Sequence, residues 1–361
     1  MKKVISTFKN IHPKFKYNGI HYDFGVLKEL AYSLVKEGKD YEKSVGNFLM
    51  DWLDDTNTIL VKTSGSTGVP KTVLLKKEHM VNSAWATGAF FKMGPGTKAL
   101  LCLSTDHIAG RMMLVRAIVL GWEIDLVEPS SNPLQFTSKH YDFAAMVPMQ
   151  VQGAFPYLKQ IGTLIIGGAP ISPELKLDLN KVDTRIFETY GMTETVTHIA
   201  VKEHAKGPED HNFKTLPDVV LSRDERDCLV IEAPKVSDAV IVTNDVINLI
   251  SPNEFHWLGR YDNVINSGGV KLIPEQLESK LSILIKSRFF VAGIPDAYLG
   301  QKLILVVEGD IDGNQLSQDI KSLNSISKYE IPKEIFSVPQ FVETGSGKVN
   351  RVETLRLLHL K

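Results

Sequence analysis

The sequence contains little cysteine and almost no net charge. Only two cysteines occur in 361 residues, Cys102 and Cys228, and each lies in an apolar run without a second thiol at the spacing of a metal or redox motif. A disulfide framework is therefore excluded, and both thiols are expected to be buried as small hydrophobic groups. The 41 basic and 42 acidic residues give a net charge of −1. This balance argues against a nucleic-acid partner, which requires a basic surface.

The sequence also lacks long apolar runs, internal repeats and low-complexity tracts. Two lysines near the N-terminus are not followed by a continuous apolar segment, and no later stretch approaches the length of a membrane span. We therefore expect a cytoplasmic protein without a membrane partner. With 43% hydrophobic and 23% charged residues, the chain is typical of a globular protein and is long enough for two domains.

The apolar pattern changes twice along the chain. Residues 23–36 are predicted to form an amphipathic helix. Its apolar stripe consists of Val26, Leu27, Leu30, Leu34 and Val35. From Thr58 onward, short β-rich runs alternate with helical segments, which predicts a layered α/β body. The C-terminal part has a helix beginning at Pro274, a strand pair and a second helix, which predicts a smaller α+β domain of about a hundred residues.

A loop rich in glycine and hydroxyl groups lies between two strand-like runs at residues 60–75, LVKTSGSTGVPKTVLL. Its residues are Thr63, Ser64, Gly65, Ser66, Thr67 and Gly68, and it ends at Lys71. Glycine lets backbone N–H groups approach phosphate oxygens, and the hydroxyls and the lysine add donors and positive charge. The alternative is a flexible hairpin turn. The spacing Gly-x-x-Gly-x-x-Lys differs from the Walker pattern, which disfavours a standard P-loop NTPase.

This loop resembles the phosphate loop of the adenylate-forming superfamily, which comprises acyl-CoA synthetases, peptide-synthetase adenylation domains and luciferases. Four later segments match the family in the same order: IIGGAP at 165–170, ETYGMTET at 188–195, LGRYDNVINSGG at 258–269 and GSGKVNR at 345–351. The resemblance implies a large domain of layered β-sheets and helices at 1–260, which binds ATP and the acid, with a reduced N-terminal subdomain. It also implies a small mobile α+β domain at 261–361.

The resemblance assigns roles in carboxylate adenylation, in which the acid attacks the α-phosphorus of ATP and pyrophosphate leaves. Thr193 would bond the α-phosphate, and Glu194 would hold the magnesium ion, which prefers hard oxygen ligands. Glycine is more common in the family where Asn244 stands. The other implied nucleotide-binding residues are Gly167, Gly168, Ala169, Tyr190 and Gly191, with Asp245 and Arg260 for the ribose hydroxyls. A polar turn is the alternative for residues 190–195.

Lys348 lies in a Gly-Ser-Gly-Lys segment, and the resemblance makes it the lysine that bridges the attacking carboxylate and the phosphate. Asp262 matches the family hinge, and Gly268 and Gly269 would face the pantetheine arm of coenzyme A after the small domain rotates. The alternatives are a surface lysine on a tail and a simple β-turn.

Residues 103–121 are expected to contribute to the binding site of the acid. In this segment His107 is expected at the start of a helix that follows a strand. By resemblance, His107 lines the site of the acid's carboxylate. The segment is similar to ligases that act on 2-succinylbenzoate in menaquinone biosynthesis, and Arg111 or Arg116 could bind the second carboxylate of such an acid. A solvated helix face or a structural ion pair is the alternative for either arginine.

The resemblance therefore implies an ATP-dependent acid:CoA ligase that uses ATP, Mg²⁺ and coenzyme A, with 2-succinylbenzoate as the expected acid. Its partners would be small molecules, and a homodimer stays open. Other readings are a ligase for a different acid, an enzyme that loads a carrier protein, and a non-catalytic relative that binds nucleotide or acyl groups. An unrelated NTPase would release ADP rather than AMP.

Overall fold

The computed structural model describes residues 8–62, 72–204, 212–343 and 349–358. Its strands are β1 (Lys16–Tyr17), β2 (Ile20–His21), β3 (Thr58–Lys62), β4 (Thr72–Lys76), β5 (Lys98–Leu101), β6 (Glu123–Leu126), β7 (Tyr141–Met146), β8 (Ile161–Ile166), β9 (Arg185–Gly191), β10 (His198–Glu203), β11 (Phe213–Thr215), β12 (Val220–Arg223), β13 (Cys228–Glu232), β14 (Ile241–Ser251), β15 (Glu254–Arg260), β16 (Ile265–Ser267), β17 (Val270–Leu272), β18 (Phe289–Asp296), β19 (Gly300–Glu308) and β20 (Glu334–Val338). The helices are α1 (Phe24–Glu37), α2 (Asp40–Leu53), α3 (Lys77–Phe91), α4 (Ile108–Leu120), α5 (Pro148–Gly153), α6 (Pro173–Leu179), α7 (Pro274–Leu281), α8 (Gly313–Ser322) and α9 (Arg351–Arg356).

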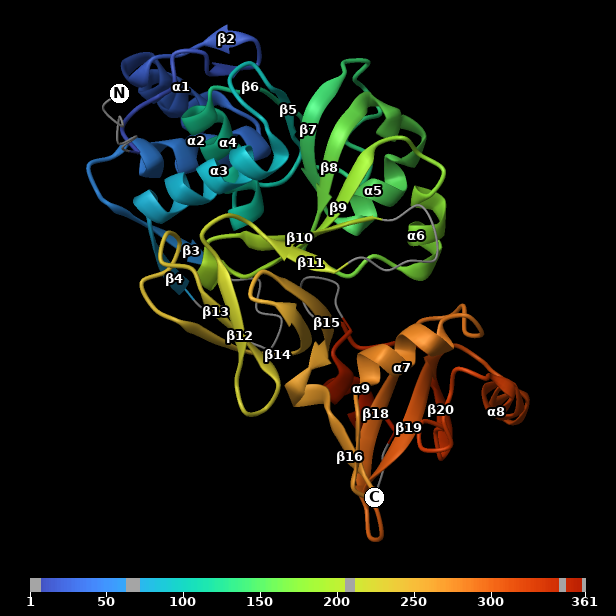
Figure 1. Ribbon diagram of the computed structural model, residues 1–361. Coiled ribbons are helices and arrows are strands. Elements are labelled where there is room, and N and C mark those ends of the chain that lie inside the picture. The colour runs from blue at the N-terminus through green and yellow to red at the C-terminus, as the bar shows by residue number, and fades with distance from the viewer. Residues whose placement is uncertain (1–7, 63–71, 205–211, 344–348, 359–361) are drawn as a thin grey trace.

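Most of the strands belong to one sheet with two halves (Figure 1). Its thirteen strands run in the order β12-β13-β14-β15-β11-β10-β9-β8-β7-β5-β6-β1-β2. The strands from β9 to β1 are parallel, whereas those from β10 to β12 pair antiparallel. The change of direction lies between β9 and β10, and the ETYGMTET string begins within β9 and ends in the turn that leads to β10.

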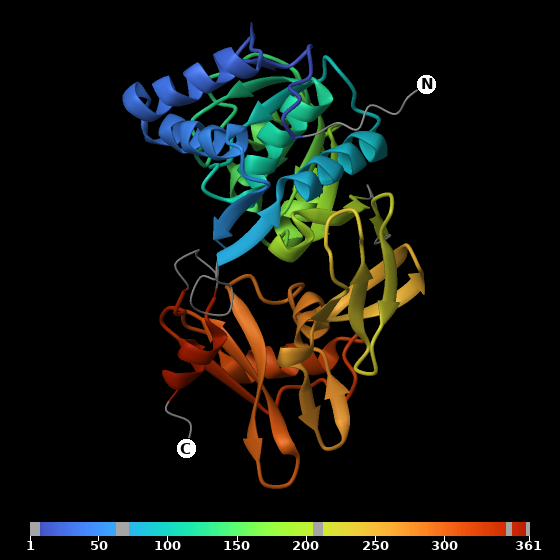
Figure 2. The same ribbon diagram turned by 90° about the vertical axis from the view of Figure 1, so that its left-hand side faces the viewer.

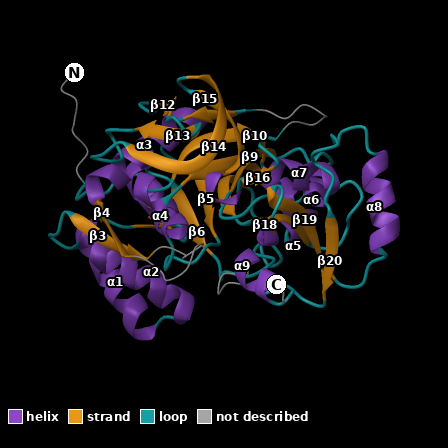
Figure 3. Cartoon of the chain, turned by 90° about the horizontal axis from the view of Figure 1, so that it is seen from below, coloured by secondary structure: helices purple, strands orange, loops and turns teal. Residues whose placement is uncertain are grey.

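Helices cover both faces of the parallel half, as expected for a sheet whose strands are buried on both sides. Helices α3 and α4 lie on one face of β5–β9, and α5 and α6 lie on the other (Figure 3). Each face has its own apolar core: Phe143 and Phe187 point to one, and Leu164 and Met146 to the other. The predicted layered α/β body is confirmed.

Local sequence explains where α1 begins. The carboxylate of Asp23 accepts a hydrogen bond of 3.0 Å from the backbone N–H of Val26, which caps the first turn. Leu27 and Ala31 are buried against α2, but Val26 is exposed, contrary to the predicted stripe. That stripe spans about half of the helix circumference at about 100° per residue. Helix α2 covers only its middle.

A second, five-stranded sheet begins beyond the large one. Its strands pair in the order β17-β16-β19-β18, and β20 pairs with β19. The large sheet ends at Arg260, and the 3₁₀ turn Tyr261–Asn263 connects it to β16. Figure 2 shows the small sheet and its helices below the large body. Division of the chain at 260/261 and rotation about Asp262 stay predictions.

Candidate nucleotide and acid site

The carboxyl ends of β7, β8 and β9 lie side by side at one edge of the sheet. Met146 pairs with Ile166, and Ile166 pairs with Glu188, so the IIGGAP string lies beside the start of ETYGMTET. Gly167 packs closely there, because a Cβ atom on it would lie 2.4 Å from Oγ1 of Thr189. The strand order of the parallel half reverses between β7 and β5, next to these ends. Open α/β sheets bind ligands outside the carboxyl ends of the strands at such a point.

Strand pairing brings three predicted nucleotide residues together. Asp245 and Arg260 are direct partners on β14 and β15. The hydroxyl of Tyr190 donates to Oδ2 of Asp245 at 2.7 Å, and Arg260 lies 3.6 Å from Oδ1. Trp257, which the sequence did not single out, donates its indole N–H to Oδ1 at 3.1 Å. We call Tyr190, Asp245, Trp257 and Arg260 the Asp245 cluster.

The Asp245 cluster rests on an aromatic base. The ring of Tyr190 packs edge-on against Phe213 and Phe255, at 5.9 and 5.2 Å between ring centroids. Burial and the neighbouring Asp245 carboxylate raise the pKa of Tyr190 far above its usual range, so its hydroxyl stays a neutral donor. The ring and the carboxylate are therefore held in place before any nucleotide binds.

A strained turn follows Tyr190. Gly191 has no room for a side chain, because a Cβ atom would lie 2.2 Å from the carbonyl oxygen of Thr197. Val196, a β-branched and buried residue, adopts φ 66°, a conformation that such residues rarely adopt. Backbone strain of this kind is maintained by surrounding structure and clusters at functional sites. The turn Thr193–Thr195 is held by the hydroxyl of Thr195, which accepts from the backbone N–H of Met192 at 3.0 Å and donates to the carbonyl oxygen of Thr197 at 2.8 Å.

Glu194 is exposed on this turn and forms no hydrogen bond or ion pair with the described part of the chain. No group of three or more His, Cys, Asp or Glu side chains that could enclose a metal occurs among the described residues. Magnesium in phosphate sites is commonly held by one or two carboxylates, by phosphate oxygens and by water. A single available carboxylate fits that mode of binding.

Two predicted segments lie outside the described residues. The phosphate-loop residues 63–71 are one, but their flanking strands β3 and β4 pair as an antiparallel hairpin, with Lys62 opposite Thr72. Strand β4 approaches the turn Thr193–Thr195 with Cα atoms within 8 Å. Lys348 is also outside, and its flanking residues Glu343 and Val349 form an isolated antiparallel bridge.

His107 is the exposed N-cap residue of α4, as the sequence predicts. It follows β5, whose carboxyl end lies at the same edge as those of β7 and β8. Arg111, one turn into the helix, is occupied by the backbone: it donates to the carbonyl oxygens of Thr105 at 2.7 Å and Leu60 at 2.9 Å. Its role is therefore to tie α4 to the hairpin β3–β4.

Arg116 is only 1% exposed and has no described carboxylate partner. Its guanidinium donates to Oγ1 of Thr87 and to Nδ1 of His198, both at 3.3 Å, and contacts the sulfur of Met113 at 3.6 Å. Burial lowers the pKa of Arg116 to about 9. The alternatives of a solvated face and an ion pair are therefore both wrong for this arginine. We call Arg116, His198 and Thr87 the Arg116 cluster.

The protonation of His198 follows from its partners. Because arginine only donates, Nδ1 of His198 must accept, and the proton lies on Nε2, 3.3 Å from Oγ1 of Thr87. Thr87 in turn donates to the carbonyl oxygen of Ser83 at 3.0 Å. Burial and the adjacent Arg116 lower the pKa of His198 well below its usual value, so the ring is neutral.

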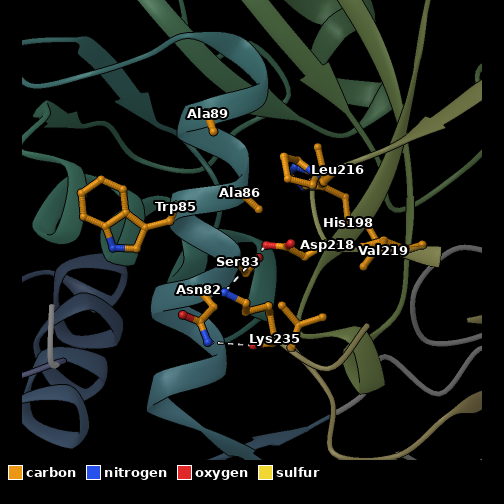
Figure 4. A pocket seen from close by; sticks show the side chains of 13 residues that line it. Asn82, Ser83, Trp85, Ala86, Ala89, His198, Leu216, Asp218, Val219 and Lys235 are labelled. Atoms are coloured by element: carbon orange, nitrogen blue, oxygen red, sulfur yellow. Dashed lines mark hydrogen bonds and ion pairs between the residues drawn. The ribbon is translucent and has the colours of Figure 1, made fainter. Parts of the chain in front are cut away.

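A pocket of about 200 Å³ opens between α3 and the strand β10, with His198 in its wall (Figure 4). Ala86, Ala89, Leu216 and Val219 supply apolar surface, and Asp218 pairs with Lys235 at 3.8 Å. At its side, the amide of Asn82 donates to the carbonyl oxygen of Lys235 at 2.9 Å. The pocket therefore joins a mostly apolar space to the Arg116 cluster through His198.

The predicted pair Gly268 and Gly269 forms the turn of the hairpin β16–β17, with φ 58° and 83°. The hairpin lies at the end of the small sheet that points away from the large one (Figures 1 and 2). The structure therefore does not bring these glycines to the Asp245 cluster. Their role toward coenzyme A stays a prediction.

No helix in the described ranges is both long and apolar enough to cross a membrane.

Both cysteines are buried, as predicted, and burial raises the pKa of Cys102 to about 12. Neither thiol is therefore available as a nucleophile at neutral pH.

Comparison with known proteins tests the family resemblance that the sequence motifs predict. The family described as AMP-binding enzyme matches residues 21–219, more than half of the chain. The 2-succinylbenzoate–CoA ligase of Enterococcus faecalis is 24% identical over 80% of this chain, and the chain spans 67% of that protein.

Two solved structures have the same fold. An acyl-CoA synthetase (AMP-forming)/AMP-acid ligase II-like protein from Dyadobacter fermentans is 36% identical, with 92% of this chain and 98% of that one covered and a TM-score of 0.61. The O-succinylbenzoate coenzyme A synthetase of Bacillus subtilis, solved with ATP and magnesium, is 21% identical, with 82% and 69% covered and a TM-score of 0.70. The predicted resemblance and fold are confirmed, and the chain belongs to the AMP-binding enzyme family.

Proposed function

We propose that the protein is an ATP-dependent acid:CoA ligase that forms AMP. In the first step a carboxylate oxygen of the acid attacks the α-phosphorus of ATP, and pyrophosphate leaves. In the second step the thiol of coenzyme A attacks the acyl carbon, and AMP leaves with the bonding electron pair. The observation that carries the proposal is the Asp245 cluster, which joins Tyr190 of the string at 188–195 and Arg260 of the string at 258–269 through the carboxylate of Asp245.

The nucleotide would bind across the sheet edge formed by β8 and β9. The carboxylate of Asp245 would accept bonds from the ribose hydroxyls, and Arg260 would donate to them. Tyr190 and Gly191 would face the adenine, while residues 63–71 and Thr193 would hold the phosphates. Glu194 would hold magnesium, which neutralises charge developing on the phosphoryl oxygens when it is bound. Lys348 would stabilise the same charge during adenylation.

The acid is proposed to be 2-succinylbenzoate, with His107 at its reacting carboxylate. Arg116 rather than Arg111 would recognise the second carboxylate, because the guanidinium of Arg111 is occupied by two backbone carbonyls. A buried cation without a carboxylate is costly for the free protein, and a ligand anion would compensate that cost. The named function of the Enterococcus relative supports this choice.

The test is pyrophosphate release with ATP and magnesium across a panel of acids, followed by mass analysis after coenzyme A is added. AMP and a CoA thioester from 2-succinylbenzoate are expected. Preference for another acid would contradict 2-succinylbenzoate as the substrate but not the assignment as an acid:CoA ligase. An acyl product that forms only on a carrier protein would favour the carrier-loading alternative. No pyrophosphate with any acid would favour a non-catalytic binding protein. Light scattering would decide whether the protein is a homodimer.

A control variant sharpens this test. Lys348→Ala should nearly abolish adenylate formation, because a contact that forms mainly in the transition state is typically worth on the order of a hundredfold to a thousandfold in rate. It should leave much of the thioester formation from a supplied acyl-adenylate. Equal loss in both half-reactions would contradict a role of Lys348 in adenylation alone.

A further inference from the structure

Apart from Arg260, the residues that hold the connection between the two sheets have no part in the proposed catalytic chemistry. It consists of the 3₁₀ turn Tyr261–Asn263, and each of its residues contacts a different group. Asp262 accepts from the amide of Asn244 at 3.2 Å and from Arg260 at 3.0 Å. Tyr261 lies under the guanidinium of Arg226, 5.1 Å from the ring centroid. Asn263 bonds the carboxylate of Glu275 on α7.

Arg226 and Asn244 form one unit beneath this turn. Arg226 donates to the side-chain oxygen of Asn244 at 2.9 Å and to the carbonyl oxygen of Thr243 at 3.1 Å. Because arginine can only donate and a carboxylate can only accept, the amide of Asn244 has one possible orientation, with its NH₂ group toward Asp262. Arg226 therefore orients the amide as well as stacking on Tyr261.

The unit stands on a rigid support. Asp224 accepts from the backbone N–H groups of Arg226 and Cys228, at 2.8 and 2.9 Å, in the turn between β12 and β13. It also pairs with the Arg226 guanidinium at 2.7 Å. The guanidinium is thus positioned by the large sheet and acts on the residues that lead into the small one.

The side-chain contacts to the turn Tyr261–Asn263 can favour one conformation of the turn and can still be broken at modest free-energy cost. The side chain of Asp262 is 53% exposed, so water can replace the amide of Asn244 at modest free-energy cost. A glycine at position 244 could make neither of the two side-chain bonds. This chain therefore has a restraint on its inter-sheet turn that a glycine would lack.

We propose that Arg226 and Asn244 are positioning residues that latch the turn Tyr261–Asn263 in the arrangement seen here, and that this latch opens when the small domain rotates between the two half-reactions. The inference rests on the proposed function, because the two half-reactions define the two arrangements. The latch acts through Tyr261 and Asp262 and needs no contact with substrate.

The experiment measures the distance between the two parts of the protein without any acid or coenzyme A. Spin labels are attached to cysteines introduced at Leu177 on α6 and at Ile283 after α7, both well exposed, whereas the natural cysteines are buried. Electron–electron resonance then gives the distance distribution. Asn244→Gly removes both side-chain bonds, and Asn244→Asp replaces the donor by a negative charge facing Asp262.

Both variants should lower the population of molecules at the main wild-type distance. For Asn244→Gly, the ratio of this population to that at other distances should fall about tenfold, because one hydrogen bond to a charged group contributes roughly that much to an equilibrium constant. The control is Arg223→Gln, which breaks the exposed Arg223–Asp227 pair of the same hairpin and should leave the distribution unchanged. A wild-type distribution in both Asn244 variants would overturn the latch. A wild-type distance distribution without one dominant distance would also overturn the latch.

Kinetics provide a second readout. Asn244→Gly should change the ratio of the adenylation rate to the thioester rate several-fold while the KM for ATP stays constant. An equal fall of both rates together with a raised KM for ATP would make Asn244 part of the nucleotide site and would overturn the proposal. The distance measurement can succeed even if no acid is turned over, so failure of the latch and failure of the proposed function are distinguishable.

Discussion

The Asp245 cluster and the Arg116 cluster handle positive charge in opposite ways. Arg260 is 39% exposed and lies near two carboxylates, those of Asp245 and Asp262. Arg116 is 1% exposed and is surrounded by a hydroxyl, an imidazole and a thioether. In the Asp245 cluster the cation has carboxylate partners in the free protein, whereas in the Arg116 cluster a buried cation has no counter-charge.

The difference has an energetic consequence. The pair between Arg260 and Asp262 is partly exposed, and such pairs typically contribute about 0–1 kcal/mol, so turning Arg260 toward ribose hydroxyls costs little. A buried cation without a counter-charge carries a desolvation penalty of several kcal/mol. The Arg116 cluster therefore lowers the stability of the free protein, and an anionic ligand would recover that free energy on binding.

The strongest test of this contrast is Arg116→Met. Under the proposed function, kcat/KM for 2-succinylbenzoate should fall about 100-fold, because charge-assisted bonds to the acid are lost. The free energy of unfolding should stay the same or rise by up to about 2 kcal/mol, because removal of the buried charge offsets the unpaired Nδ1 of His198. Steady-state kinetics and urea denaturation measure the two quantities.

Met113→Leu is the matched control, since it removes the thioether contact to the guanidinium but keeps the charge. It should change both quantities little. If activity and stability of Arg116→Met instead fall together by comparable free energies, Arg116 is a structural residue and the contrast between the two clusters is wrong.

A smaller effect is expected when charge is removed from the Asp245 cluster. Asp245→Asn keeps an acceptor for the indole N–H of Trp257, and the hydroxyl of Tyr190 can accept from the new amide. Because both buried partners keep a hydrogen bond, stability should change by only about 1 kcal/mol. The KM for ATP in pyrophosphate release should rise about tenfold, because the ribose hydroxyls lose a charged acceptor.

Asp245→Ala separates bonding from charge, because it leaves the buried donors of Tyr190 and Trp257 without an acceptor. It should lower stability by about 1–3 kcal/mol in addition to the effect on KM. Equal KM values for ATP in Asp245→Asn and the wild type would show that the Asp245 cluster is not the ribose site.

The sequence predicted best where the signal is local. The runs 58–62 and 72–76 are the strands β3 and β4, and His107 caps the helix that follows β5. Asp245 and Arg260 could be assigned only through the family strings, since no periodicity shows that they are direct partners on adjacent strands. Local patterns therefore place elements, and the strings place residues at the site.

The Arg116 cluster was not predictable as a cluster. Its members come from α3, α4 and β10, and only the packing of both helices on the sheet brings residues 87, 116 and 198 together. One signal was available: α4 is apolar all round, and such helices are buried in the core. An arginine near its C-terminal end is therefore more consistent with burial than with a solvated face.

The smallest predicted effect concerns His198 and pH. Its pKa in the folded protein lies well below 6.5, whereas in the unfolded chain it has the ordinary value. Below about pH 6.5 the unfolded chain therefore binds the extra proton and the folded protein does not, so stability is full above that pH and is lost as the pH falls toward the lower folded pKa.

His198→Gln isolates this contribution, because an amide can also accept from Arg116 and donate to Thr87. The unfolding free energies of the wild type and the variant, measured by urea denaturation between pH 7.5 and 5, should run parallel above about pH 6.5. Below that pH the wild type should fall more steeply, by up to about 1.4 kcal/mol per pH unit. His12, His79 and His204, whose pKa values are also lowered, contribute equally to both proteins and cancel in the difference. Parallel curves over the whole range would mean that His198 is protonated in the folded state, beside a buried arginine that would then face a second uncompensated charge.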